Sequence, residues 1–142
     1  MIVKIANSDD PRLVEIWESA VRATHHFLKE EDFLFYKKQL PTYFRQVTLY
    51  GFKQDHTLVG FIGVAHSSLE MLFVENNHRG AGIGKRLATY AMTQLKVTEV
   101  DVNEQNTQAV GFYQHLGFRV VKRSALDGEG RGYPILHLQL EQ

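Results

Sequence analysis

Three glycines within five residues, Gly80, Gly82 and Gly84, stand between an apolar stretch and a segment with helical periodicity. Because glycine lacks a Cβ, the backbone can turn tightly there and approach a ligand closely. After the glycines, apolar side chains recur every fourth position and mark one face of a helix, at Ile83, Leu87, Ala91 and Leu95. The chain must therefore form a strand, a glycine turn and a helix in succession.

The N-terminus of such a helix leaves backbone N–H groups free and carries partial positive charge, so the glycine turn before it forms an anion site. Arg79 and Lys85 add formal positive charge at the two ends of the turn. Both cations would oppose the helix dipole unless an anion lies between them. We therefore expect the segment from Arg79 to Lys85, which includes Ala81 and Ile83, to bind phosphate.

The spacing excludes two common phosphate loops. A Walker loop needs a hydroxyl residue directly after its lysine, but Arg86 follows Lys85. A dinucleotide fingerprint needs a glycine at the position that Lys85 occupies. The pattern that fits is Arg-x-x-Gly-x-Gly, which runs from Arg79 through Gly82 to Gly84.

At this motif the chain resembles the GNAT superfamily of N-acetyltransferases, in which [Gln/Arg]-x-x-Gly-x-[Gly/Ala] lies between a strand and a helix. The resemblance implies that the loop amides hold the pyrophosphate of acetyl-coenzyme A, the cosubstrate. It also implies that the backbone around Leu72, Phe73 and Val74 holds the pantetheine arm like an added strand. The sulfur is then expected at a split between the fourth and fifth strands, where a strand N–H could polarise the thioester carbonyl.

A second signature lies between residues 103 and 118 and contains Asn106, Ala109, Phe112-Tyr113 and Gly117-Phe118. By themselves these residues predict a helix that Asn106 caps and Gly117 ends, with a core stripe between them. The same residues occur in the GNAT family, so the resemblance adds Asn106, Ala109 and Phe112 to the cofactor site.

Tyr113 is the residue of this signature that carries proton chemistry. The resemblance implies that it is the general acid that protonates the departing coenzyme A thiolate. A tyrosine with an ordinary pKa of about 10 is protonated at neutral pH and can donate. The alternative interpretation is a simple core tyrosine.

The acceptor amine must lose a proton, and there are three candidates for the base that removes it: Glu70, a histidine or a water relay. Glu70 lies nine positions before Arg79, and strand alternation puts it on the face of Leu72 and Val74. His25 and His26 lie in the loop that walls the acceptor site in this family. Four more residues are weaker candidates for the same wall: Tyr43, Phe44, Tyr133 and Pro134. Each of these residues can equally be an ordinary surface or core residue.

Periodicity along the chain predicts the element order βααβββαβαββ. Strands are expected near residues 2–6, 47–52, 58–65, 69–74, 97–102, 118–122 and 135–140. Helices are expected from Asp9-Asp10-Pro11, over 30–45 with Pro41 bending or dividing it, from the glycine loop to about 95, and over 107–116. This element order is similar to that of the GNAT family, and the resemblance implies the GNAT fold, an α/β (α+β) arrangement with a mixed, mostly antiparallel sheet of six to seven strands and about four helices on both faces. One domain should span residues 1–142.

Composition excludes several other functions. Sixteen basic and sixteen acidic residues cancel, which argues against nucleic acid as a partner. No apolar run reaches the roughly 18 residues of a membrane span, so no membrane partner is expected. The chain has no cysteine, which fits a cytoplasmic protein and rules out an acetyl-cysteine intermediate. Its seven histidines lack metal-ligand spacing, so no metal is expected.

The predicted activity is transfer of acetyl directly from acetyl-coenzyme A to a primary amine of a small molecule, a peptide or a protein lysine. Two alternatives stay open: a non-catalytic sensor of acetyl-coenzyme A with the same fold, and an acyltransferase that uses a longer acyl-coenzyme A. The resemblance also allows a homodimer.

Overall fold

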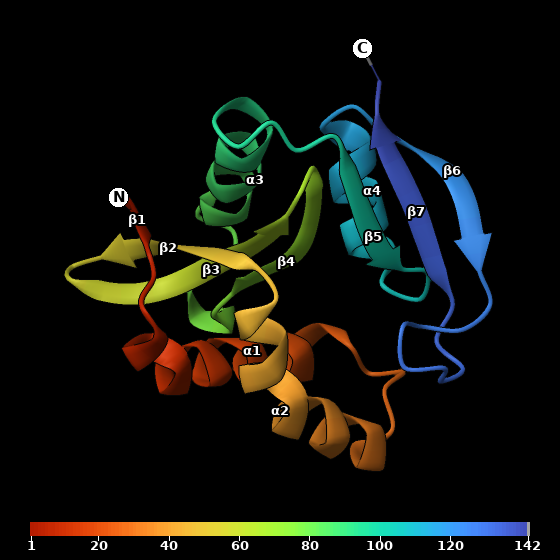
Figure 1. Cartoon of the computed structure of the whole chain (residues 1–142), viewed down its shortest axis with the longest axis horizontal. Helices are drawn as coiled ribbons and strands as arrows, with labels where there is room; N and C mark the ends of the chain where they lie inside the picture. Colours follow the sequence, from red (N-terminus) through yellow and green to blue (C-terminus); the bar gives the residue numbers. More distant parts are fainter. Residues whose placement is uncertain (142) are drawn as a thin grey trace.

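Seven strands pair into one sheet in the order β1-β2-β3-β4-β5-β7-β6 in the computed structural model, which describes residues 1–141 (Figure 1). The strands are β1 (Ile2–Lys4), β2 (Thr48–Gln54), β3 (Thr57–Ala65), β4 (Ser68–Val74), β5 (Glu99–Asn103), β6 (Phe118–Ser124) and β7 (Ile135–Leu140). The helices are α1 (Asp10–Thr24), α2 (Glu30–Arg45), α3 (Ile83–Thr93) and α4 (Thr107–His115), with short 3-10 turns η1 (Asn7–Asp9) and η2 (Asn76–His78). The predicted element order is confirmed.

The sheet is mixed, as predicted, because β4 and β5 run parallel while every other neighbouring pair is antiparallel. The β2–β3 hairpin turns at Asp55 and His56, whose φ angles are 51° and 66°. Two successive residues with positive φ match the twist of a hairpin, so the turn needs only two residues. It is therefore shorter than the four residues expected from the sequence.

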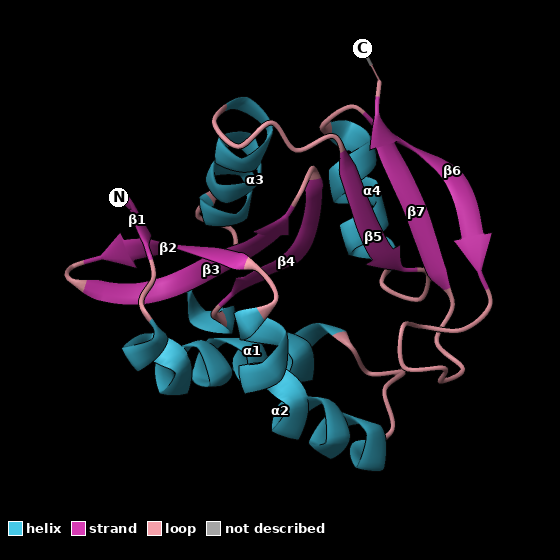
Figure 2. Ribbon diagram, in the orientation of Figure 1, coloured by secondary structure: helices cyan, strands magenta, loops and turns pink. Residues whose placement is uncertain are grey.

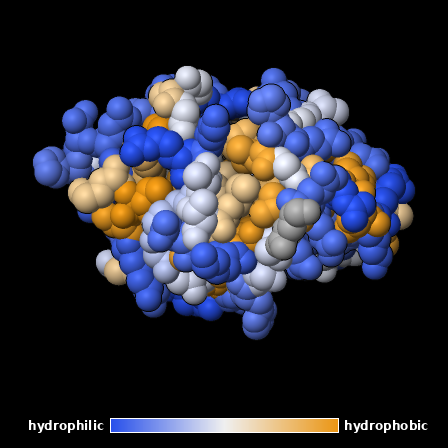
Figure 3. Space-filling view, turned by 90° about the horizontal axis from the view of Figure 1, so that it is seen from above, coloured by the Kyte–Doolittle hydropathy of each residue, from blue (hydrophilic) through white to orange (hydrophobic). Residues whose placement is uncertain are grey.

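Helices cover both faces of the sheet, with α1 and α2 on one face and α3 and α4 on the other (Figure 2). The central strand β3 contributes to both layers: Phe61 packs among residues of α1 and α2, and Ile62 among residues of α3. Within residues 1–141, no helix combines the length and apolar character needed to cross a membrane. Seen from above, apolar residues also reach the surface near the middle of the molecule, between hydrophilic ones (Figure 3).

The parallel pair β4–β5 is short and separates after two residue pairs, Ser68 with Glu99 and Leu69 with Val100. Beyond this point the two strands diverge. The sheet thus consists of two antiparallel parts, β1–β4 and β5–β7–β6, joined at one end of a split. The position of this split agrees with the expectation from the family resemblance.

Glu70 is an extra residue in β4, because Leu69 pairs with Val64 and Met71 pairs with the adjacent Gly63. Such a β-bulge interrupts the alternation of side chains along a strand. Leu69 consequently packs on the same side as Leu72 and Val74, while Met71 and Phe73 pack against α1 and α2. Simple alternation, on which the predicted placement of Glu70 beside Leu72 and Val74 was based, does not hold at Glu70, because the bulge changes the register there.

Some predicted boundaries also need correction. Helix α2 continues through Pro41 and is not divided there, since Leu40 and Phe44 on either side of the proline are both buried in the core. The first strand ends at Lys4, and Ile5 and Ala6 lead into the 3-10 turn η1, which begins at Asn7. Helix α3 ends two residues early, at Thr93, and Lys96 then adopts a left-handed φ of 58° before the buried Val97.

Candidate active site

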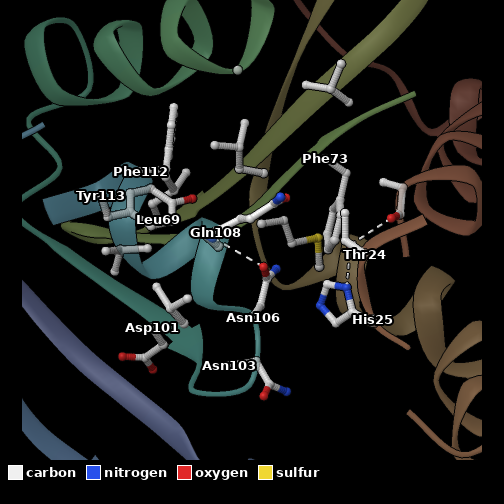
Figure 4. Close-up of a pocket in the computed structure, with 18 of the residues that line it drawn as sticks. Thr24, His25, Leu69, Phe73, Asp101, Asn103, Asn106, Gln108, Phe112 and Tyr113 are labelled. Atoms are coloured by element: carbon white, nitrogen blue, oxygen red, sulfur yellow. Dashed lines mark hydrogen bonds between the residues drawn. The ribbon is translucent and has the colours of Figure 1, made fainter. Parts of the chain in front are cut away.

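A cavity of about 390 Å³ lies where β4 and β5 separate. Its walls come from the end of α1, from β4 and β5, from the glycine loop and from α4. The residues predicted from the sequence that line it are His25, Glu70, Leu72, Phe73, Val74, Arg79, Gly84, Asn106, Ala109, Phe112 and Tyr113. Figure 4 shows Tyr113 and Phe112 on one side of the cavity, Thr24 and His25 on the other, and Asn106 between them. The split therefore brings most of the predicted residues together.

The glycine loop leaves open space at the positions where side chains would otherwise stand. Gly80 and Gly82 have φ angles of +85° and +79°, and a Cβ at either position would meet no atom within 4 Å. Gly82 is the N-cap of α3 and offers no side-chain cap, so the first N–H groups of the helix face open space. Open space, free N–H donors and the adjacent Arg79 fit an anionic group such as a pyrophosphate.

The side chains of the loop differ in where they lie. Arg79 reaches α4, where its Nη2 donates a hydrogen bond to Oε1 of Gln108 at 3.1 Å. Ile83 is buried in the core, so only its backbone is available to a ligand. Lys85 lines a separate hollow beside Arg86 and is not brought to the main cavity. Of the two cations predicted for the phosphate, the structure places Arg79 at the cavity.

Helix α4 is fixed at both ends by the caps predicted from the sequence. The side-chain Oδ1 of Asn106 accepts a hydrogen bond from the backbone N–H of Ala109 at 3.2 Å. At the other end Gly117 has a φ of +105°, and its N–H donates to the carbonyl of Gln114 at 3.1 Å. These caps set the rotation of the helix that directs Tyr113 toward the split.

Tyr113 is a core residue that also lines the cavity. It is 6% exposed, and its ring packs edge-on against Phe112 and Phe118, with ring centroids 5.1 and 5.8 Å apart. Burial alone raises the pKa of Tyr113, without a contribution from any neighbouring charge. The phenol therefore keeps its proton across the physiological pH range, which a proton donor requires.

Glu70, at the bulge of β4, lines the cavity and two adjoining hollows. Burial raises the pKa of its carboxyl, and the negative charges of Asp101 and Glu99 raise it further. A hydrogen bond from Ser68 and the charge of His66 oppose this shift. A carboxylate with a raised pKa is a stronger base than an ordinary one, so the environment of Glu70 suits proton abstraction.

The two predicted histidines lie in different surroundings. His25 lines the main cavity, and burial, followed by the charge of His26, lowers its pKa to about 4. Its Nδ1 lies 2.7 Å from Oγ1 of Thr24. His26 is exposed and lines a small hollow beside Arg22 and Phe33, outside the main cavity. Of the pair, the structure places His25 at the site.

A second cavity of about 310 Å³ adjoins the first and lies between α1, α2, β4 and the loop from β6 to β7. Tyr43 and Tyr133, two of the weaker predictions, line it. Phe44 does not, because it is 1% exposed and packs edge-on against Phe61 in the core. Successive residues of a helix point about 100° apart, so Tyr43 and Phe44 cannot face the same cavity. Pro134 lines neither of the two cavities.

The loop from β6 to β7 is held to α2 by polar contacts that the sequence did not reveal. Asp32, 7% exposed in the first turn of α2, accepts hydrogen bonds from Arg131 Nη1 at 2.5 Å and from the hydroxyl of Tyr133. The hydroxyl of Tyr36 donates to Asp127 of the same loop. An acidic residue in the first turn of a helix is usual for dipole reasons, so Asp32 gave no signal of its own.

Sequence reasoning also missed four polar residues that line the cavity, namely Thr24, Asp101, Asn103 and Gln108. Only Thr24 and Gln108 had a usable signal, since each directly precedes a predicted residue. Within residues 1–141, no group of three or more His, Cys, Asp or Glu side chains could hold a metal ion.

Comparisons with known proteins agree with this geometry. A family model described as an acetyltransferase (GNAT) domain matches residues 18–141. The peptidyl-lysine N-acetyltransferase YjaB of Salmonella typhimurium is 36% identical, over 97% of this chain and 98% of that protein. The solution structure of apo-form YjaB from Escherichia coli has a TM-score of 0.83 at 34% identity, over 98% of this chain and 95% of the other.

A more distant solved structure shares the fold alone. The PaiA N-acetyltransferase from Thermoplasma acidophilum, in complex with coenzyme A, has a TM-score of 0.69 at 23% identity. The match covers 98% of each chain. The two chains therefore have the same overall fold.

Proposed function

This chain belongs to the GNAT acetyltransferase family, and we propose that the acceptor of its acetyl transfer is the side-chain amine of lysine in peptides or proteins. That it is an N-acetyltransferase follows from the family and from relatives with this activity. The observation that carries the proposed acceptor is the position of Glu70, which lines both the cavity in the split and the cavity beside α2. An amine that enters beside α2 meets a carboxylate where the two cavities join.

The residues around the split support acetyl-coenzyme A as the donor. When bound, it supplies the activated acetyl group as a thioester. The N–H groups at the start of α3 and the guanidinium of Arg79 would hold its pyrophosphate. The edge of β4 at residues 72–74 faces the split and would bind the amides of the pantetheine arm, as in strand addition.

Two side chains have the properties that the proton transfers require. Glu70 takes the proton of the incoming ammonium, and its raised pKa makes it the better base. The amine nitrogen then forms a bond to the acetyl carbon as the carbon–sulfur bond breaks, and the nitrogen releases its second proton to solvent. Tyr113 gives its proton to the departing thiolate and is reprotonated from solvent. No residue becomes acetylated in this scheme.

The cavity beside α2 has the shape and chemistry for a lysine side chain. Its walls are largely apolar or aromatic and suit a four-carbon aliphatic stem, as at Trp17, Leu28, Met71 and Tyr133. Glu70 and Asp127 supply negative charge toward an ammonium. The relatives that are 34% and 36% identical are peptidyl-lysine N-acetyltransferases, which supports the same acceptor here. A chain without cysteine further supports a cytoplasmic setting.

The test is thiol release from acetyl-coenzyme A with a panel of acceptors. The panel contains a peptide with one lysine and a blocked N-terminus, the same peptide with that lysine acetylated, and a lysine-free peptide with a free N-terminus. Turnover with the first peptide alone is the expected result. Turnover only with the free N-terminus would overturn the lysine assignment, and tight donor binding without turnover on any amine would indicate a sensor.

A further inference from the structure

The hydroxyl of Thr24 determines which ring nitrogen of His25 carries a proton. Thr24 Oγ1 lies 2.8 Å from the carbonyl oxygen of Ala20 and 2.7 Å from Nδ1 of His25. A carbonyl oxygen can only accept, so the single hydroxyl proton of Thr24 points to Ala20. The lone pair of the same oxygen then accepts from Nδ1–H. Neutral His25 therefore carries its proton on Nδ1 and a free lone pair on Nε2.

His25 holds this state over a wide pH range. Burial and the neighbouring His26 lower its pKa to about 4, so the ring is neutral at physiological pH. The C-terminal end of α1, where His25 is the C-cap, would favour a charged ring, but the burial outweighs this effect. The lone pair on Nε2 is thus a fixed hydrogen-bond acceptor.

His25 stands where the two cavities of the site meet. Five residues line both cavities: His25, Glu70, Met71, Phe73 and Asn103. His25 and Glu70 are the two of them with titratable side chains. Figure 4 shows the ring of His25 beside Thr24, on the side of the cavity opposite to Tyr113. An acceptor amine that enters the split from the cavity beside α2 passes this ring.

The tautomer matters because of what an attacking amine needs. A neutral primary amine has one lone pair and two N–H groups, and its lone pair must face the acyl carbon. An N–H group that meets a hydrogen-bond acceptor helps to orient the amine in this way. A proton on Nε2 would instead donate to the amine lone pair and block the attack.

We propose that Nε2 of His25 accepts a hydrogen bond from the acceptor amine and turns its lone pair toward the acyl carbon, and that Thr24 is the positioning residue that keeps Nε2 free of a proton. This inference rests on the proposed function for the identity of the amine. The geometry of Thr24, Ala20 and His25 carries the tautomer independently of any substrate.

The tautomer is measured by nitrogen NMR of protein with ¹⁵N-labelled histidine at pH 7, with His25→Gln to assign the signals. In the wild-type protein, Nδ1 should show the shift of a protonated nitrogen and Nε2 that of a nitrogen with a lone pair. Thr24→Val keeps the shape but removes the hydroxyl and should move the ring toward the Nε2–H form. Thr24→Ser keeps the hydroxyl and should restore the wild-type pattern. A protonated Nε2 in the wild-type protein overturns the inference.

Kinetics with the single-lysine peptide test the consequence. Thr24→Val should lower kcat for the peptide roughly tenfold, the value of about one hydrogen bond, and leave the Kd of acetyl-coenzyme A within about twofold. Thr24→Ser should restore kcat. Thr93→Val is the matched control, since Thr93 Oγ1 also donates to the carbonyl four residues earlier, at 2.8 Å, but has no histidine partner there.

The outcomes separate this inference from the proposed function. A wild-type enzyme that acetylates no lysine peptide overturns the proposed function, while the NMR measurement still decides the tautomer. If Thr24→Val changes the tautomer but leaves KM and kcat unchanged, only the contact between His25 and the amine is overturned, and the assignment of the tautomer still holds.

Discussion

Arg131 Nη1 lies 2.5 Å from Oδ1 of Asp32, and this contact joins the loop between β6 and β7 to the first turn of α2, 99 residues earlier in the chain. The hydroxyl of Tyr133 donates to the other oxygen of the same carboxylate. Because Tyr133 lines the cavity proposed for the acceptor, Asp32 fixes one wall of that cavity without lining it.

Replacement of Asp32 by Asn should loosen this wall. The KM for the lysine peptide should rise several-fold, as expected for the loss of one charge-assisted hydrogen bond. The urea midpoint of unfolding should fall, while the affinity for acetyl-coenzyme A stays unchanged. Steady-state kinetics, urea titration and calorimetry provide the three measurements. An unchanged KM would mean that the loop does not need this tether.

The stability effect of Asp32 should depend on pH. Hydrogen bonds from Tyr133 and then Arg131 lower the pKa of Asp32 in the folded protein. Because the pKa of Asp32 is lower in the folded protein than in the unfolded chain, where it is about 3.8, the ionised side chain stabilises the folded protein at pH values above 3.8. This stabilisation is lost as the pH falls from 3.8 toward the folded-state pKa. The gap in stability between wild type and Asp32→Asn should therefore be constant near neutral pH and shrink below about pH 4. A gap that grows on acidification would contradict this.

Tyr113→Phe should lower kcat about a hundredfold, within the range of a lost general acid. The Kd of acetyl-coenzyme A should stay within about twofold, since the ring and its edge-on contacts with Phe112 and Phe118 are retained. Stopped-flow kinetics and calorimetry separate the two effects. If turnover is equal to wild type at every pH, Tyr113 is only a core residue.

Glu70 should control the acidic limb of the pH–rate profile. Because burial and Asp101 raise the pKa of Glu70, kcat/KM should begin to fall on acidification at a higher pH than it would with an ordinary glutamate. Glu70→Gln should lower the rate and remove this limb. Asp101→Asn removes one of the charges that raise the pKa, so the limb should move to lower pH. If Asp101→Asn shifted it to higher pH, the assignment to Glu70 would be wrong.

Gly82→Val should abolish binding of acetyl-coenzyme A. A valine at a φ of +79° is strained, and its side chain would stand in the open space before α3. Gly130→Val is a matched control, because Gly130 has a φ of +75° and equally open surroundings but lies in the loop from β6 to β7. Calorimetry should show a lost donor affinity for the first variant only. If both variants lost donor affinity equally, backbone strain rather than the place of Gly82 in the glycine loop would explain the loss.

The sequence predicted most of the fold because its signals are periodic or local. The glycines, the caps of α4 and the alternation in β7 each act within a few residues, and the structure confirms the elements that they predict. The bulge at Glu70 was missed, since an extra strand residue has no compositional signature.

The missed parts of the site depend on long-range packing. Asp32 and Arg131 meet only after α2 and the β6–β7 loop have docked. Nothing in the adjacent pair of His25 and His26 tells which ring becomes buried. For the same reason the sequence could not show that the side chain of Lys85 turns away from the cavity.

The split between β4 and β5 leaves the backbone hydrogen bonding of the sheet incomplete at its centre. Two residue pairs join its halves, and past them the peptide groups on the facing edges lack a neighbouring strand. A donor that binds along β4 would supply the missing hydrogen-bond partners and would link the two parts of the sheet reversibly. Amide hydrogen exchange along this seam should then slow when donor is added. The concentration of acetyl-coenzyme A would thereby determine the local stability of the sheet at the split as well as the reaction rate.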